Sequence, residues 1–263
     1  MNNGDRRRAS GLRLSLASAG AAILLWMASA ATQTAGAAES AQPSTARVLI
    51  LTGNEYPGHP WKLTAPAIAD FLRKDNRLTV AIQEDPNFLA SPRLHDYDTI
   101  VLNYMNWESP DPGEEARENL RKFVSGGKGL VLVHFACGAF QEWPEFKKLA
   151  GRAWDPKLRG HDPRGPFKVD ITDADHPITK GLKAFDTDDE LYTCLAGDAE
   201  IKVLAKATSK VDKKDYPMAF VLNYGKGRVF HCALGHDVKA LSFDGVQELY
   251  RRGTAWTAGL AVK

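Results

Sequence analysis

The sequence predicts an α/β fold with a mainly parallel sheet flanked by helices. Through the first half, short apolar runs typical of buried strands alternate with amphipathic helical segments, in the order β-α-β-β-α-β. The second half contains further segments with strand-like alternation and one Gly-Lys-Gly turn, which predict additional antiparallel strands. The composition, 44% hydrophobic and 25% charged among 263 residues, suits one globular domain with a sizeable core.

Residues 1–37 have the pattern of a secretory signal peptide. Arg6-Arg7-Arg8 precede an alanine-rich apolar segment over residues 14–31, and Ala35-Gly36-Ala37 supplies a small-residue cleavage site. The strongly apolar centre is short for a membrane span, so we expect cleavage after Ala37 and no stable membrane anchor afterwards. A periplasmic or secreted protein is therefore predicted, exported by the general or the twin-arginine route.

Charge and cysteine content exclude two classes of protein. Loss of the signal peptide removes four arginines and one aspartate, so the formal net charge changes from +2 to about −1. Because no basic patch is interleaved with aromatic residues, we expect no nucleic-acid partner. Cys137, Cys194 and Cys232 are odd in number and without close pairs, which argues against a disulfide framework.

A linker over residues 38–46 leads to a domain expected over residues 47–260. A helix is predicted from near Thr64 to Lys74, with Pro66 in its first turn. Its buried face is expected to contain Leu63, Ala67, Ile68, Phe71 and Leu72. The strands of the first half are predicted at residues 47–51, 78–82, 98–103 and 129–133.

Two further helices have recognisable start signals. Asp111 is the predicted cap of one helix, with Pro112 at the first position and Glu114 bonding back to the cap. The last helix is expected to start at Asp244, with Gln247 closing a capping box. Strands of the second half are predicted at residues 167–171, near 190–192, and at 201–205, 218–222 and 227–231, with Gly225-Lys226-Gly227 as a hairpin turn.

His134 is the most informative residue of the chain. It follows the buried strand over residues 129–133, and the small residues in Phe135-Ala136-Cys137-Gly138 permit a tight strand-to-helix turn. Ligands of open α/β sheets bind at the carboxyl ends of the strands, where an imidazole can serve as a ligand or a proton shuttle. The alternative is a histidine that only hydrogen-bonds to a loop.

Other polar side chains are expected at the same edge of the sheet. His59, His161 and His236 lie at strand ends or in the loops that follow strands. Glu190 and Tyr192 share one face of a short strand, opposite Leu191, and such a pair suits proton transfer or the binding of sugar hydroxyls. A solvated acidic loop is the alternative for Asp188-Asp189-Glu190.

Histidines and a carboxylate could also bind a divalent metal ion. The candidate ligands are His59, His134 and His236, and they come from distant segments because no closely spaced metal motif is present. His95 and His176 are expected at the surface, and His231 within a strand. Cys137 is a weaker candidate, as a thiol nucleophile, since an exposed free thiol is a liability in an exported protein.

Several motifs spread over residues 47–260 carry a family resemblance: Gly58-His59 with Trp61, Leu102-Asn103-Tyr104 with Trp107, Gly126 to Phe140, Gly160-His161 with Arg164 to Phe167, His176 to Leu182, Asp188 to Tyr192, Gly225 to Phe230, and Gly235-His236-Asp237. Together they resemble the ThuA-like (trehalose utilisation) family, which implies a flavodoxin-like, class I glutamine amidotransferase-like fold. True amidotransferases have a Gly-x-Cys-x-Gly elbow, whereas Leu132-Val133-His134-Phe135-Ala136 places His134 at the position of the cysteine. The resemblance therefore implies the fold and argues against glutaminase activity.

The resemblance implies a function in carbohydrate metabolism, on trehalose or related disaccharides and their 3-keto forms. A keto group acidifies neighbouring C–H bonds, so a cluster of His, Glu and Tyr could act as an isomerase, lyase or hydrolase by general acid–base steps, with or without a metal. The expected catalytic residues are His134, Glu190, Tyr192 and His236, and the expected substrate-binding residues are His59, Trp61, Trp107, His161 and Asp237.

Two other functions stay open on the residues alone. The aromatic side chains Tyr56, Trp61, Tyr104, Trp107 and Trp143 could stack on sugar rings, so a sugar- or glycan-binding module without turnover is the alternative. A hydrolase that uses Cys137 is the third. In the first two cases, the partner is a small carbohydrate.

Overall fold

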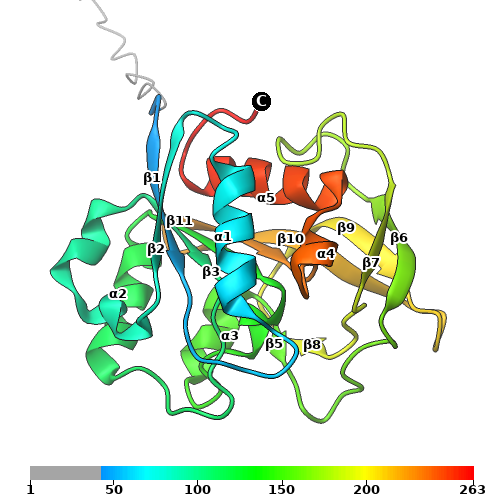
Figure 1. Cartoon of the computed structure of the whole chain (residues 1–263), viewed down its shortest axis with the longest axis horizontal. Helices are drawn as coiled ribbons and strands as arrows, with labels where there is room; N and C mark the ends of the chain where they lie inside the picture. The colour runs from blue at the N-terminus through cyan, green and yellow to red at the C-terminus, as the bar shows by residue number, and fades with distance from the viewer. Residues whose placement is uncertain (1–42) are drawn as a thin grey trace, which may run out of the picture. The chain divides into compact units, whose positions relative to one another are not determined.

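The computed structural model describes residues 43–263 (Figure 1). The predicted signal peptide over residues 1–37, and most of the predicted linker, lie outside this range. Within it, no helix combines the length and the apolar character that a membrane crossing would need.

A nine-stranded sheet forms the centre of the domain, in the order β2-β1-β3-β4-β11-β10-β9-β6-β7. Its first five strands in this order are parallel, and the remaining four continue it in antiparallel fashion. The predicted α/β fold, mainly parallel with antiparallel strands from the second half, is thus confirmed. The strands are β1 (Ala46–Leu51), β2 (Leu78–Gln83), β3 (Thr99–Leu102), β4 (Gly129–Val133), β11 (Gly227–Cys232), β10 (Asp215–Tyr224), β9 (Lys202–Thr208), β6 (Gly165–Ile171) and β7 (Phe185–Asp189), with β5 (Ala153–Trp154) and β8 (Leu195–Ala196) as a separate pair.

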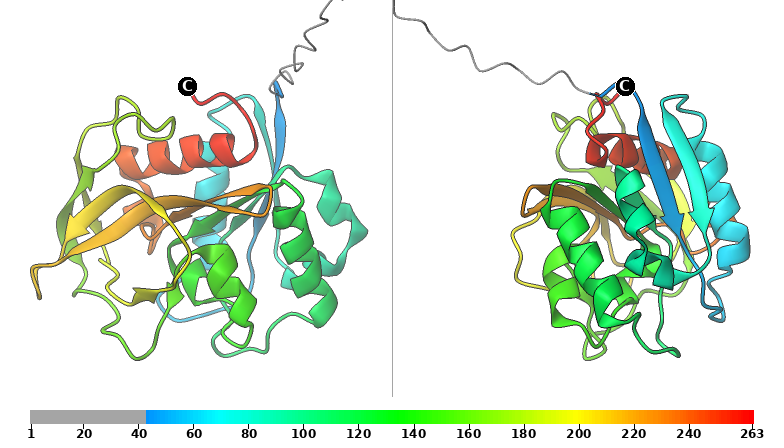
Figure 2. Two further views of the ribbon diagram at one scale, coloured as in Figure 1. Left: turned by 180° about the vertical axis from the view of Figure 1, so that it is seen from behind. Right: turned by 90° about the vertical axis from the view of Figure 1, so that its left-hand side faces the viewer.

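Helices cover both faces of the sheet (Figures 1 and 2). One core contains side chains from α1 (Trp61–Leu72), α4 (Val238–Leu241) and α5 (Asp244–Thr257). The opposite core contains those of α2 (Glu114–Ser125) and α3 (Pro144–Ala150), together with the short 3₁₀ segments η1 (Pro86–Ala90) and η2 (Pro92–Asp96). The central strands β3 and β4 are buried along their whole length, as expected when both faces of a sheet are covered, and neighbouring residues enter opposite cores.

Three details of the helices differ from the sequence prediction. Leu63 is 60% exposed, because α1 begins at Trp61 and its buried stripe runs from Thr64 and Ala65 instead. Asp111 does not cap α2, since Asn106 Nδ2 donates to its carboxylate at 2.7 Å, and Gly113 takes the cap position. Gln247 does not close a capping box, because the cap residue of α5 is Phe243, which has no side-chain acceptor.

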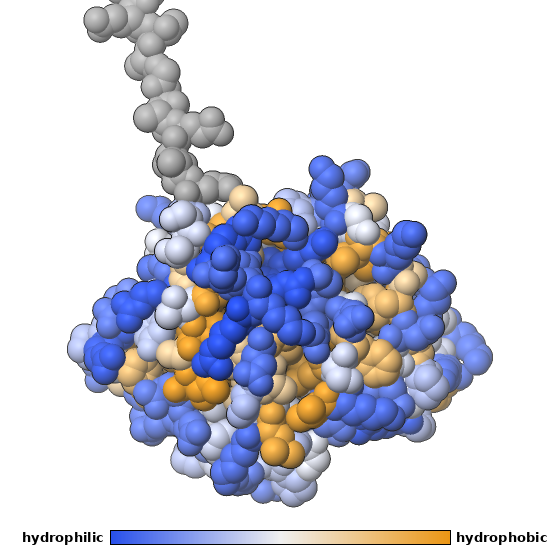
Figure 3. Space-filling model, turned by 45° about the horizontal axis from the view of Figure 1, so that its top comes forward, coloured by the Kyte–Doolittle hydropathy of each residue, from blue (hydrophilic) through white to orange (hydrophobic). Residues whose placement is uncertain are grey.

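The face of the domain seen in Figure 3 is mostly hydrophilic, with apolar areas between the polar side chains. On the outer side of α5, Glu248 pairs with both Arg251 and Arg252. His176, expected at the surface, is instead buried: its ring lies against Trp256, with ring centroids 5.3 Å apart, and its Nδ1 accepts a hydrogen bond from the backbone N–H of Ile178.

His231 in β11 predicts a loss of stability in acid. The ring is fully buried, its Nδ1 donates to the Ala150 carbonyl at 3.1 Å, and its Nε2 has no partner among the described residues. Burial lowers the pKa of His231 from 6.5 to about 4. Between pH 6.5 and pH 4, His231 is therefore mostly protonated in the unfolded chain but mostly neutral in the folded chain. The free energy of unfolding falls as the pH decreases through this window, by roughly 3 kcal/mol.

The measurement is urea unfolding of the wild type and of His231→Asn between pH 7 and pH 4. The wild type is expected to lose more stability than the variant over this window, whatever the absolute stability of the variant at pH 7. Parallel pH profiles for the two proteins would show that His231 is not the group that titrates.

Candidate functional site

His134 occupies the turn at the end of β4. It starts the 3₁₀ segment η3 (His134–Gly138) with a φ of +43°, which is an uncommon and strained conformation for a residue other than glycine. Its Nδ1 lies 2.8 Å from the Ala233 carbonyl oxygen, and its Nε2 lies 2.7 Å from the Tyr192 hydroxyl. Since a carbonyl only accepts, Nδ1 carries the hydrogen, and Nε2 accepts from Tyr192. The backbone turn and the two hydrogen bonds together hold the ring in one tautomer.

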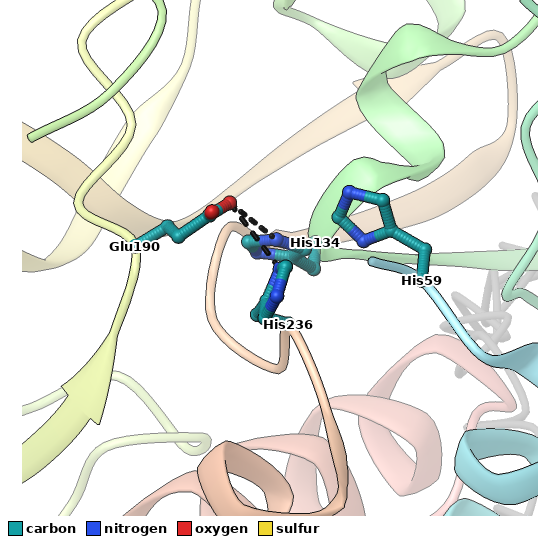
Figure 4. A group of neighbouring side chains, drawn as sticks. All are labelled: His59, His134, Glu190 and His236. Atoms are coloured by element: carbon teal, nitrogen blue, oxygen red, sulfur yellow. Dashed lines mark ion pairs between the residues drawn. The ribbon is translucent and has the colours of Figure 1, made fainter. Parts of the chain in front are cut away.

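Four side chains from distant segments meet at this turn (Figure 4). His59, His134, Glu190 and His236 each offer one potential ligand atom, and these atoms all lie within 4.8 Å of one another. The histidines follow the parallel strands β1, β4 and β11, whose carboxyl ends share one edge of the sheet. Glu190 enters from the end of β7. The structure therefore brings together the three predicted metal candidates and one predicted catalytic carboxylate.

The carboxylate of Glu190 lies among three imidazoles. Its Oε2 is 3.3 Å from His236 Nδ1 and 3.6 Å from His134 Nε2, and its Oε1 is 3.6 Å from His161 Nε2. Burial raises the pKa of Glu190, but His134 and His236 lower it more, so that it falls well below its usual range. Glu190 is thus ionised at neutral pH.

The histidines of the site differ in their protonation. The pKa of His59 is lowered to about 2, first by burial and then by the neighbouring His134 and His236. Burial also lowers the pKa of His236, but the carboxylates of Glu190 and Asp189 outweigh it, and the net change is upward. The site therefore contains a neutral imidazole, an ionised carboxylate and an imidazole that gains a proton more easily than usual.

Asp189 connects the two chain segments that carry Glu190 and His236. Its fully buried carboxylate accepts hydrogen bonds from the backbone N–H of Gly235 at 2.6 Å, of Glu190 at 2.8 Å and of His236 at 3.2 Å. Gly235 has a φ of +111°, and a Cβ there would lie 2.9 Å from Leu241, so the loop needs glycine at this point. Asp189 was not among the predicted functional residues; its place in an acidic run at a strand end was the available signal.

Asp237 and Tyr192 support the site from two sides. Arg164 donates to both carboxylate oxygens of Asp237, whose Oδ1 also accepts from the backbone of Ala240 and caps α4. The predicted substrate-binding carboxylate is therefore already engaged within the protein. Tyr192 is 1% exposed, and burial raises its pKa well above the usual value, so its hydroxyl stays protonated and donates to His134.

An aromatic shelf borders the four side chains and consists of Tyr56, Trp107, Phe135 and Trp154. Ring centroids are 4.2 Å apart for His59 and Phe135, 4.7 Å for Trp107 and Phe135, and 5.0 Å for Trp107 and Trp154. Trp107 is 36% exposed, and its Nε1 donates to the Gly138 carbonyl, which fixes the orientation of the indole. This shelf offers stacking surface next to the imidazoles.

The other aromatic candidates lie in different places. Trp61 and Tyr104 line the cavity at the site. Trp143 does not, because it packs on Phe140 and Phe146 beside α3. The prediction that Trp143 lies near the site is therefore wrong.

The cavity at the site is small. It encloses about 30 Å³ and is lined by His59, His134 and His236 together with aromatic and small residues. This is room for an ion or a few water molecules, and not for a sugar ring. A much larger hollow of about 1030 Å³ is lined by Lys202, Tyr224 and Trp256, toward the opposite ends of the strands, and contains none of the predicted site residues.

The comparisons with known proteins agree with this architecture. The family model for ThuA, described as trehalose utilisation, matches residues 47–257. This chain belongs to the ThuA family. Among curated proteins, no sequence matches it.

Solved structures show that the ThuA fold is shared. A ThuA-like protein from Parabacteroides merdae ATCC 43184 has 24% identity and a TM-score of 0.74, over 83% of this chain and 92% of that one. A ThuA-like protein from Bacteroides uniformis ATCC 8492 has 21% identity and a TM-score of 0.66, over 82% and 92%. A cytoplasmic protein from Salmonella typhimurium LT2, STM1381, has 15% identity and a TM-score of 0.54, over 80% and 99%.

The elbow of this ThuA-family chain offers no thiol nucleophile. Cys137, three residues beyond His134, is fully buried, and burial raises its pKa well above the usual value. A thiol that neither ionises nor meets solvent cannot attack a substrate, so the weakest of the three functional predictions, a Cys137 hydrolase, is wrong.

Proposed function

We propose that this chain is an exported enzyme of carbohydrate metabolism that acts on a keto form of trehalose or a related disaccharide by general acid–base catalysis. The observation that carries the proposal is the convergence of Glu190 with His59, His134 and His236 in one site. Membership of the ThuA family supports the substrate class, and the pattern of residues 1–37 supports export to the periplasm or the medium.

The geometry supports proton transfer next to a carbonyl group. The carboxylate of Glu190 would remove the proton from a carbon beside the keto group, and the electron pair would move onto the carbonyl oxygen to give an enol. His236, close to Glu190, would protonate that oxygen. Return of a proton to the carbon completes an isomerisation or epimerisation; loss of the glycosidic oxygen, with a proton delivered to it, completes an elimination.

The size of the cavity supports an arrangement in which only the reacting edge of the sugar approaches the histidines. The rest of the disaccharide would lie outside the cavity, where Trp107 and Tyr56 can stack on a pyranose ring. His161, whose ring is partly exposed next to Glu190, would then contact a sugar hydroxyl. A binding module without turnover would use the same shelf, so turnover has to be measured directly.

The test is incubation of residues 38–263 with 3-ketotrehalose, with and without divalent metal ions, followed by NMR. We expect conversion of the keto sugar and, in D₂O, exchange of deuterium into the position beside the carbonyl. An unchanged spectrum under all conditions would refute the enzyme. If saturation-transfer signals showed a bound sugar in the same samples, the protein would be a binding module instead.

A further inference from the structure

We propose that His59, His134, Glu190 and His236 bind one divalent transition-metal ion, with Zn²⁺ as the best match. The proposal concerns the same site as the proposed function and deepens it. It can be tested without any substrate, so its failure can be told apart from the failure of the sugar chemistry.

The spacing of the four side chains fits one ion. Zinc binds imidazole nitrogen and carboxylate oxygen at about 2.0–2.2 Å, which places tetrahedral ligands roughly 3.4 Å apart. The four ligand atoms here lie within 4.8 Å of one another, and His236 Nδ1 is already 3.3 Å from Glu190 Oε2. Modest side-chain rotations of His59, on its loop, and of Glu190 would close the remaining gap.

Two of the imidazoles can turn a lone pair toward a metal. His134 donates through Nδ1 to Ala233, so its Nε2 carries the ring's lone pair; this lone pair accepts from the Tyr192 hydroxyl, which would release it when Nε2 binds an ion. His236 Nδ1 is buried and makes no hydrogen bond within the described residues, although it faces the carboxylate. A buried ring nitrogen without a hydrogen-bond partner is costly, and a metal ion would remove that cost.

The surroundings have the features of a supporting outer shell. A metal-binding histidine usually donates its other ring nitrogen to a carbonyl or carboxylate, as His134 does to Ala233. Asp189 fixes the backbone on both sides of the site through Glu190, Gly235 and His236. We therefore assign Asp189 as a positioning residue of the metal site.

The donor set also selects the kind of ion. Three imidazoles and one carboxylate favour Zn²⁺ and neighbouring first-row ions, whereas Mg²⁺ and Ca²⁺ require mostly oxygen ligands. When bound, such an ion would polarise the carbonyl oxygen of a keto sugar in place of protonation by His236, and Glu190, held through Oε2, would keep Oε1 free to act as the base. The cavity of about 30 Å³, which is lined by the three histidines but not by Glu190, has room for the ion.

The experiment uses the chain without a histidine tag, stripped by a chelator and dialysed. Zn²⁺ content is measured by elemental analysis after reloading, and Co²⁺ is titrated as a spectroscopic probe, with Mg²⁺ and Ca²⁺ as comparison ions. We expect about one Zn²⁺ per chain, visible Co²⁺ bands typical of a four- or five-coordinate site, and a rise in Tm with Zn²⁺ but not with Mg²⁺.

Variants localise the binding. His59→Ala, on a partly exposed loop where folding is not at risk, is expected to weaken Co²⁺ binding more than 100-fold, and His95→Ala, an exposed histidine of η2, is expected to leave it unchanged. Asp189→Asn should weaken binding 10- to 100-fold and shift the Co²⁺ bands. The Asn amide has one oxygen in place of two, so its NH₂ group would face a backbone N–H that the Asp189 carboxylate now accepts from. Asp188→Asn, next to it but paired with Lys239 and Arg164 outside the four proposed ligands, serves as its matched control.

Three results would overturn the proposal: no Zn²⁺ retained by the folded wild type, Co²⁺ spectra of a six-coordinate solvated ion, or equal binding by wild type and His59→Ala. Unaltered binding in Asp189→Asn would refute the positioning assignment alone.

Discussion

Replacing Glu190 by glutamine is expected to reduce kcat/KM for the keto-sugar reaction by about 10³-fold, which corresponds to roughly 4 kcal/mol of transition-state stabilisation. The side chain keeps its size but loses its negative charge at a point where it faces His134, His161 and His236. General acid–base catalysis contributes about 10²- to 10⁴-fold, so the loss of the base accounts for most of the effect.

Steady-state kinetics with circular dichroism checks this prediction. Glu142→Gln provides a matched control, because Glu142 is exposed and lies outside the site. The loss in the Glu190 variant should appear mainly in kcat, since the aromatic shelf that would bind the sugar is untouched. Full activity in Glu190→Gln would contradict the assignment of this carboxylate as the base.

Replacing Gly253 by alanine is expected to cost about 3 kcal/mol of stability, the upper end of the usual penalty for overpacking a core. Gly253 lies in α5 where the helix crosses β11, and a Cβ there would lie 2.2 Å from Cδ1 of Phe230. Phe230 is fully buried, so its ring has no solvent-facing space to move into. The helix and the strand would have to separate.

Thermal and urea unfolding measure the cost, with Gly165→Ala as the control. Gly165 begins β6, and a Cβ there meets nothing within 4 Å. Gly253→Ala should lower the Tm by roughly 5–10 °C, whereas Gly165→Ala should change stability by less than about 1 kcal/mol. Equal Tm values for the two variants would show that α5 can move away from the sheet at little cost.

Local sequence signals were sufficient for the fold class and for most elements. The apolar run of β4 is buried on both faces, and the Gly225-Lys226 turn joins β10 and β11 as a two-residue hairpin connection. Both features depend on residues close together in the chain, and periodicity and turn chemistry describe such residues well. The error at Asp111 arose because its carboxylate is engaged by Asn106. The error at Gln247 arose because the cap of α5 lies one residue earlier than expected, at Phe243, and Gln247 Nε2 donates to the Leu241 carbonyl instead.

The site needed more than local signals. Strand-end positions indicated that His59, His134 and His236 share one edge of the sheet, since carboxyl ends of parallel strands lie together. Glu190 could not be placed that way, because it follows β7, at the far antiparallel edge of the sheet order. Its loop returns to the histidines through the hydrogen bonds of Asp189 to residues 235 and 236.

The sequence alone therefore determined the class of fold, the family and the type of side chain available for chemistry. Only the tertiary structure decided that Cys137 is sealed in the interior, that Trp143 lies away from the site, and that Glu190 lies between His134 and His236. The physical reason is the range of the interactions: helix and strand periodicity acts over a few residues, whereas burial and the meeting of charges depend on how segments more than 50 residues apart pack together.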